Sequence, residues 1–166
     1  MAKHLGYLST NIFPEAGNAD DLICENYFED KIVSLTEFPG MSPDLFKSLV
    51  DNNEIKGFIL RAFGAGDASA ALRPAFEYLM GKEIPIVVTT QAPRGISNFQ
   101  VNEPGKFLKD NKLAIPAHDM SIESQTTKLM WLLAKKRREK FNYLQLCTKM
   151  VENVRGEIDV HFEIGL

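Results

Sequence analysis

The chain has 166 residues, of which 45% are hydrophobic and 25% charged, and its formal net charge is −3 at neutral pH. These values are typical of one globular domain and exclude a disordered or collagen-like chain. The charge gives no overall field that attracts nucleic acid, no apolar run is long enough to cross a membrane, and residues 1–10 do not resemble a signal peptide. Cys24 and Cys147 form no C-x-x-C pair, so we expect reduced thiols in a cytoplasmic protein.

The first half of the chain alternates β-branched runs with apolar residues at helical spacing. Ser42 is placed to cap the first helix, and the run at 86–90 is too hydrophobic for a strand with an exposed face. The predicted order is strand 31–38, helix 45–50, strand 55–63, helix 72–80 and strand 86–90.

The second half continues this alternation after a long polar loop. We predict a loop at 91–111 with one helical turn near Phe107, a strand at 113–117, a helix from Ser121 to Leu133, and a last helix at 140–154. The β-α-β-α order predicts a three-layer α/β domain: an open parallel sheet of about four strands with helices on both faces. We assign this domain to 31–166 and predict a linker or arm at 1–30, which lacks the pattern.

The loops after the parallel strands are the places where such a fold binds ligands. Arg61 ends an apolar strand, where its guanidinium can hold a carboxylate with two hydrogen bonds or form a structural salt bridge. Asp67 can orient an amine or cap a turn. The glycine-containing segment 64–69 only approximates a dinucleotide fingerprint, and no acid follows the next strand to hold a ribose, so we expect no cofactor.

Other chemical patterns are weaker. His118 and Asp119 have no metal-ligand spacing, and no nucleophile-elbow sequence places Ser97, so we expect neither a metal site nor a serine triad. The basic run 135–138 is predicted between two helices, where it is solvated or touches phosphates. Trp131 and Leu132 lie off the main apolar stripe of their helix, which indicates burial against a partner or ordinary burial on two sides.

Several segments resemble, in order, the second domain of type I (cytoplasmic-type) bacterial L-asparaginases. They are 38–42 (FPGMS), 57–67 (GFILRAFGAGD), 84–91 (IPIVVTTQ), 114–120 (AIPAHDM), 128–133 (KLMWLL) and 153–158 (NVRGEI). The resemblance covers most of 31–158 and implies the Rossmann- or flavodoxin-like fold of that domain. A relative with the same architecture is the D subunit of the archaeal glutamyl-tRNA amidotransferase, although the Arg-Gly-Glu ending is more similar to the asparaginases.

The resemblance implies hydrolysis of L-asparagine to L-aspartate and ammonia, with a threonine nucleophile in the family's first domain. The sequence has no Thr-Gly-Gly-Thr-like or Thr-Asp-Gly segment, so we expect no catalytic residue in this chain and no activity of the chain alone. The second domain of the family forms subunit interfaces and completes the neighbouring substrate site through an asparagine. That asparagine is replaced here by Asp67, beside Gly66, and an ionised carboxylate cannot donate a hydrogen bond.

Some type I members also hold an allosteric asparagine in this domain. The resemblance implies such an amino-acid site at Arg61, Thr90, Gln91 and Ala92, where Ala92 replaces a cysteine typical of the site. The implied partners are asparagine or aspartate, a second copy of the chain in a homodimer or larger oligomer, or a separate catalytic-domain chain, with no nucleic acid and no membrane. Alternatives are a non-catalytic amino-acid-binding or interaction module, and a component of a tRNA-linked amidotransferase.

Overall fold

The computed structural model describes residues 24–92, 95–97, 107–108 and 112–159. Of the predicted arm at 1–30, only the segment from residue 24 onward therefore falls within the described part. Within that part, no helix is both long and apolar enough to cross a bilayer.

The core of the fold is a four-stranded parallel sheet whose strands lie in sequence order. The strands are β1 (Ile32–Thr36), β2 (Gly57–Ala62), β3 (Ile86–Thr90) and β4 (Ile115–Pro116). All four lie within predicted strands, and β4 is shorter than expected. The carboxyl ends of β1, β2 and β3 lie at one edge of the sheet, because Thr36 pairs with Arg61 and Arg61 pairs with Thr89.

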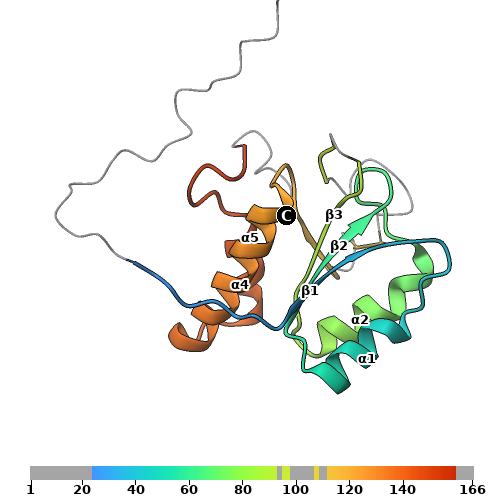
Figure 1. Cartoon of the computed structure of the whole chain (residues 1–166), viewed down its shortest axis with the longest axis horizontal. Helices are drawn as coiled ribbons and strands as arrows, with labels where there is room; N and C mark the ends of the chain where they lie inside the picture. The colour runs from blue at the N-terminus through green and yellow to red at the C-terminus, as the bar shows by residue number, and fades with distance from the viewer. Residues whose placement is uncertain (1–23, 93–94, 98–106, 109–111, 160–166) are drawn as a thin grey trace, which may run out of the picture.

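Helices cover both faces of the sheet, as predicted (Figure 1). They are α1 (Asp44–Asn53), the short 3₁₀ helix Ala70–Leu72 with α2 (Arg73–Gly81), α4 (Ile122–Glu139) and α5 (Tyr143–Val151). Phe107 and Leu108 are also helical, at the predicted turn. The three-layer α/β prediction is confirmed.

Side-chain alternation along the strands divides the core into two clusters. Phe58 and Leu60 of β2 pack with buried residues of α1 and α2, whereas Ile59 packs with Val87 and with buried residues of α4 and α5. Gly57 allows α4 to approach the sheet closely, since a Cβ atom there would lie 3.0 Å from the Cδ1 atom of Leu133.

Helix α4 differs from the prediction in its length. It continues through Glu139, so the basic run 135–138 forms its last turn and does not lie between two helices. Cations at a helix C-terminus interact favourably with the helix dipole, and the helix ends at Lys140 in a left-handed conformation. The predicted cap is confirmed, because the Ser121 hydroxyl accepts a hydrogen bond from the N–H of Ser124 at 3.2 Å.

The remaining differences concern helix ends and one apolar face. α1 begins at Asp44, and the Ser42 hydroxyl accepts a hydrogen bond from the Asp44 N–H at 3.2 Å. α5 is shorter than the predicted 140–154 and begins with a capping box between Asn142 and Gln145. Leu132 is buried in the core, so ordinary burial explains this part of the second apolar face.

Candidate functional site

The candidate site is the sheet edge where β1, β2 and β3 end. There the Gln91 side chain binds two backbone carbonyls, one directly after β1 and one in β2. Its amide nitrogen donates to the carbonyl of Glu37 at 2.7 Å and to the carbonyl of Arg61 at 3.1 Å. The Arg61 carbonyl also accepts a hydrogen bond from the Glu37 N–H at 2.9 Å. Both N–H groups of the Gln91 side-chain amide therefore hold the strand ends together. The side-chain oxygen of Gln91 can accept a further hydrogen bond.

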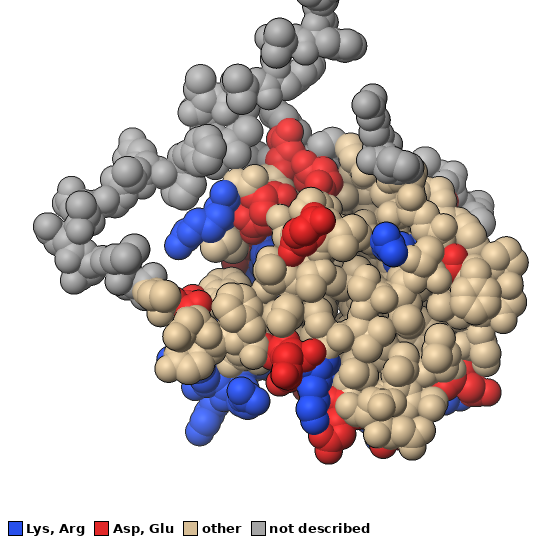
Figure 2. Space-filling model, in the orientation of Figure 1, with Lys and Arg blue, Asp and Glu red and all other residues tan. Residues whose placement is uncertain are grey.

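Arg61 is the exposed cation of this edge. It interrupts the otherwise buried strand β2, and among the described residues its guanidinium has no hydrogen-bond or ion-pair partner. Alternation places its side chain on the face covered by α4 and α5, the same face as Ile59. The surface over the end of β2 is mostly uncharged (Figure 2). An exposed guanidinium, with its five N–H donors, is suited to a carboxylate or phosphate.

Thr90 lies on the opposite face of the sheet from Arg61. Its hydroxyl donates to the carbonyl of Gly64 and accepts a hydrogen bond from the N–H of Ala92 at 2.9 Å. It is buried, whereas Ala92 is exposed. Thr90 therefore fixes the loop after β2 to the loop after β3, and the structure does not bring its hydroxyl together with the Arg61 guanidinium.

The loop after β2 is a tight turn that presents Gly66 and Asp67. The N–H groups of both residues donate to the carbonyl of Phe63, at 2.9 Å and 2.7 Å. Gly66 is buried with φ +95°, a conformation that disfavours any other residue. Asp67 is half-buried, which leaves part of its side chain at the surface beside the sheet edge.

Glu37 is a buried acid that sequence reasoning missed. Only 2% of it is exposed; its Oε1 atom accepts a hydrogen bond from the Ser69 N–H at 2.8 Å, and its Oε2 atom has no partner in the described part of the chain. Burial raises the pKa of the Glu37 carboxyl, and the Ser69 N–H opposes this by lowering it. Alternation from the half-buried Val33 and Leu35 is the signal that could have placed Glu37 on the α1 and α2 face.

A second buried charge lies on α4. The Nζ atom of Lys128 donates to the Oε1 atom of Glu157 at 2.6 Å and to the carbonyl of Glu152. Burial lowers the pKa of Lys128, opposed by Glu157. Burial raises the pKa of Glu157, but hydrogen bonds from Lys128 and from the N–H groups of Arg155 and Val154 outweigh it, so the pKa is about 2. This ion pair attaches the C-terminal loop to α4.

The residues considered for metal or triad chemistry have structural partners. The Ser97 hydroxyl donates to the Val88 carbonyl at 2.7 Å, and the Asp119 carboxylate accepts a hydrogen bond from the Asp159 N–H at 3.2 Å. Burial lowers the pKa of His118. Within the described part, no group of three His, Cys, Asp or Glu side chains is arranged to hold a metal ion. The arrangement at the sheet edge thus offers anion binding through Arg61 but no activated nucleophile.

Comparison with known proteins places this geometry in context. Residues 31–141 match the family model of the glutaminase/asparaginase C-terminal domain. The chain is 32% identical over 135 residues to the D subunit of glutamyl-tRNA(Gln) amidotransferase from Aeropyrum pernix, a match that covers 81% of this chain and 30% of that protein. It is 31% identical over 148 residues to the L-asparaginase of Thermococcus kodakarensis, covering 87% of this chain and 42% of that one.

Solved structures similar to this chain are also L-asparaginases. The thermostable L-asparaginase from Thermococcus kodakarensis superposes with a TM-score of 0.73 at 30% identity, over 88% of this chain and 43% of that chain. L-asparaginase I from Vibrio cholerae gives a TM-score of 0.67 at 25% identity, over 78% and 38% of the two chains. The chain thus spans less than half the length of these relatives.

Proposed function

The chain belongs to the glutaminase/asparaginase C-terminal domain family, and from this we propose that it forms the non-catalytic part of an asparaginase-like amidohydrolase. The reaction is the hydrolysis of L-asparagine to L-aspartate and ammonia. We propose that a threonine supplied outside the described fold attacks the amide carbon and that its hydroxyl proton passes to the amide nitrogen. The tetrahedral intermediate then expels ammonia and leaves an acyl-enzyme. The acyl-enzyme is hydrolysed by water to aspartate, which regenerates the hydroxyl.

The observation that carries this proposal is the exposed Arg61 at the carboxyl edge of the sheet, whose guanidinium has no partner among the described residues. In our proposal, Arg61 binds the carboxylate of asparagine or aspartate, and the Gln91 carbonyl oxygen and the exposed backbone near Ala92 lie beside it. The Thr90 hydroxyl acts indirectly by holding the loop after β2. Gly66 and Asp67 complete the substrate site of a neighbouring catalytic portion, where the Asp67 carboxylate attracts the substrate ammonium.

We propose further that the protein is cytoplasmic, that it functions as a homo-oligomer or with a catalytic partner, and that it needs no cofactor.

Isothermal titration of the chain with L-asparagine tests the proposed amino-acid binding. We expect saturable heat that Arg61→Gln weakens about tenfold, because a bidentate charged contact is lost. Arg73→Gln is the matched control, since the Arg73 guanidinium lies on α2 and is already paired with Glu77 at 2.8 Å.

An ammonia assay on the same preparation tests whether the chain alone hydrolyses asparagine. We expect no ammonia from asparagine above the rate of buffer alone. Ammonia release that Arg61→Gln abolishes would show that the chain itself is catalytic. Absence of asparagine, aspartate and glutamine binding would contradict both the amino-acid site and the alternative of a purely amino-acid-binding module.

A second candidate is a component of a tRNA-linked amidotransferase, which the relatives named as D subunits of glutamyl-tRNA(Gln) amidotransferase favour. The basic end of α4 offers little free charge for RNA. Lys135, Lys136 and Arg137 form ion pairs with Glu25, Glu83 and Glu29 at 2.9, 3.5 and 3.6 Å. RNA binding that weakens steeply with salt would favour this candidate over the first.

A further inference from the structure

A groove of about 680 Å³ runs along α4, the arm of the chain before β1 and the C-terminal loop. Ser124, Lys128, Trp131 and Lys135 lie along its floor at helical spacing. From the first to the last of these residues the helix rises about 16 Å, which is the length of an extended peptide of about five residues. Charged side chains of both signs gather over α4 and the C-terminal loop (Figure 2).

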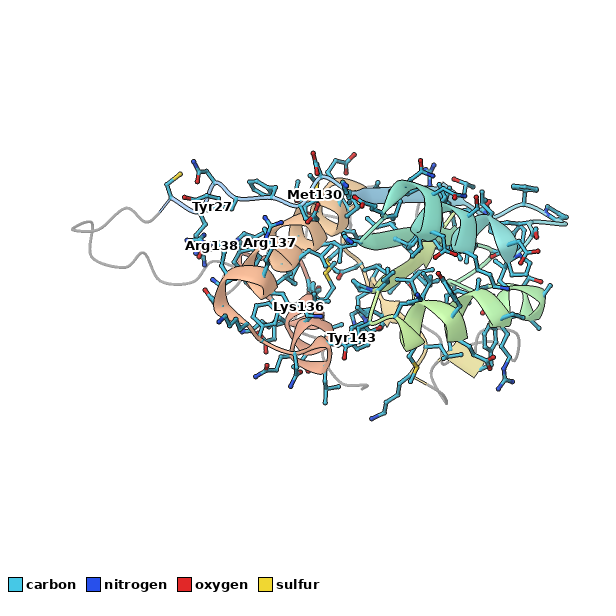
Figure 3. The ribbon with its side chains drawn as sticks, turned by 90° about the horizontal axis from the view of Figure 1, so that it is seen from below. Tyr27, Met130, Lys136, Arg137, Arg138 and Tyr143 are labelled. Atoms are coloured by element: carbon cyan, nitrogen blue, oxygen red, sulfur yellow. The ribbon has the colours of Figure 1, made fainter. Side chains whose placement is uncertain are left out.

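One wall of the groove is an extended segment, residues 24–30, which we call the arm. Its side chains attach it to α4: Glu25 accepts hydrogen bonds from the Trp131 indole at 2.7 Å and from Lys135 at 2.9 Å. Tyr27 lies against Arg138, with 4.1 Å between the ring centroid and the guanidinium carbon (Figure 3). The N–H of Glu29 donates to the carbonyl of Met130 at 3.0 Å.

The backbone of the arm, in contrast, is open. Among the described residues, no backbone hydrogen bond involves the N–H or C=O groups of residues 25–28. Glu25 and Phe28 both line the groove, so the backbone between them borders it. An extended segment with unpaired N–H and C=O groups is a template for the addition of a strand.

The charge of the groove is complementary to one acidic group. Lys128 is paired with Glu157, and Lys135 is paired with Glu25. Arg155 is exposed, and among the described residues its guanidinium makes one hydrogen bond, from Nη1 to the neighbouring Val154 carbonyl at 2.9 Å. The described residues that line the groove therefore leave one positive charge unbalanced, that of Arg155.

We propose that this groove binds an extended peptide that pairs with the arm as an added strand. The peptide places an acidic side chain at Arg155 and, two residues later on the same side, an apolar side chain between Trp131 and Phe28. Both apolar contacts line the groove, and Phe28 is 49% exposed without such a partner. Alternate side chains of a strand point the same way, so two residues at this spacing face the same side of the peptide.

Fluorescence anisotropy with a labelled probe tests the proposal. The probe is the peptide Ser-Thr-Glu-Thr-Leu-Thr with its C-terminus amidated, and the protein is the full chain. We expect saturable binding that Arg155→Gln weakens about tenfold and Phe28→Ala about fivefold. Phe28 and Arg155 are both exposed, hence both variants retain the fold, which circular dichroism verifies. Arg73→Gln on the opposite face of the sheet serves as the matched control and leaves binding unchanged.

Two further probes test the mode of binding. Replacing the glutamate of the peptide by lysine removes binding if the Arg155 guanidinium binds the acidic side chain of the peptide. N-methylation of alternate backbone nitrogens removes binding if the peptide pairs with the arm, and leaves it intact if only side chains are recognised, which would contradict the added strand. The proposal is overturned if no saturable binding is seen up to about 1 mM peptide, a concentration that corresponds to a weak binding free energy of about −4 kcal/mol. It is also overturned if the Arg155→Gln variant binds the peptide equally well. Self-association of the chain that Arg155→Gln abolishes, without peptide binding, also overturns it.

Discussion

Arg61 and Glu37 are charged residues at neighbouring strand ends, but their side chains have different surroundings. Arg61 points to the face of α4 and α5 and is exposed, so its charge is solvated and available. Glu37 follows β1 on the other face, where one carboxylate oxygen binds the Ser69 N–H and the other has no partner in the described part. The first arrangement favours ligand binding; the second imposes a cost on folding, since a buried unsatisfied acceptor loses its hydration.

This difference leads to a prediction for Glu37→Gln. The folded pKa of Glu37 is raised by burial, so the folded state holds the proton more tightly than the unfolded state. Stability linked to this group is present at low pH and is lost as the pH rises through the raised pKa. Since glutamine keeps an acceptor for the Ser69 N–H without a charge, we expect Glu37→Gln to be more stable than the natural chain by about 1 kcal/mol at pH 8.

Urea denaturation at several pH values measures this effect. The advantage of Glu37→Gln should shrink towards acidic pH, where the natural carboxyl is protonated. Glu152→Gln is the control, because Glu152 is exposed and within the described residues its carboxylate accepts no hydrogen bond. A pH-independent difference between the two proteins would mean that folding does not raise the pKa of Glu37.

At the scale of the elements, the sequence predicts most of the sheet and its helices because local signals agree with one another. Apolar runs, Ser121 as a cap and glycine stops place the elements within a few residues. The end of α4 is not predictable in this way. In this last turn Lys135, Lys136 and Arg137 form ion pairs with Glu25, Glu83 and Glu29, which are distant in sequence. The candidate site has a similar limit. Local patterns identify Arg61, but the register between β2 and β3 is needed to show that the Thr90 side chain lies on the opposite face of the sheet.

The packing of α4 on β2 gives a prediction for Gly57→Ala. The added Cβ would lie 3.0 Å from the Cδ1 atom of Leu133 and 3.2 Å from the Cδ2 atom of Leu129, so these side chains must shift. We expect a loss of about 1–2 kcal/mol in the free energy of unfolding, as overpacking of a core produces. Gly81→Ala is the matched control at the end of α2, where nothing lies within 4 Å, and it should be neutral or slightly stabilising. Equal effects of the two variants in urea denaturation would contradict the close approach.

At the scale of the whole molecule, a buried ion pair attaches the C-terminal loop to α4. Glu157 binds Lys128 at 2.6 Å and also accepts hydrogen bonds from the N–H groups of Val154 and Arg155. Lys128 is only 5% exposed and Glu157 14%, so solvent cannot replace either partner. The same loop contributes Arg155 to the peptide groove. The Glu157 carboxylate therefore contributes both to the stability of the domain and to the shape of that groove.

The last prediction concerns Glu157→Gln and acid. Removing one partner leaves the Lys128 ammonium buried without a counter-charge, so we expect a loss of about 3 kcal/mol at pH 7. The folded pKa of Glu157 is about 2, below the usual value of 4.5, so its contribution is complete above the usual value and is lost as the pH falls towards 2. The natural chain should therefore lose stability between about pH 4.5 and 2, relative to Glu157→Gln, in thermal denaturation followed by circular dichroism. Glu54→Gln is the control, because it removes a pair between two exposed side chains, Glu54 (69% exposed) and Lys31 (45% exposed), and should change stability little. Similar losses for the two variants would mean that the Lys128 site is open to water in solution, and the groove beside it would then lack a fixed wall.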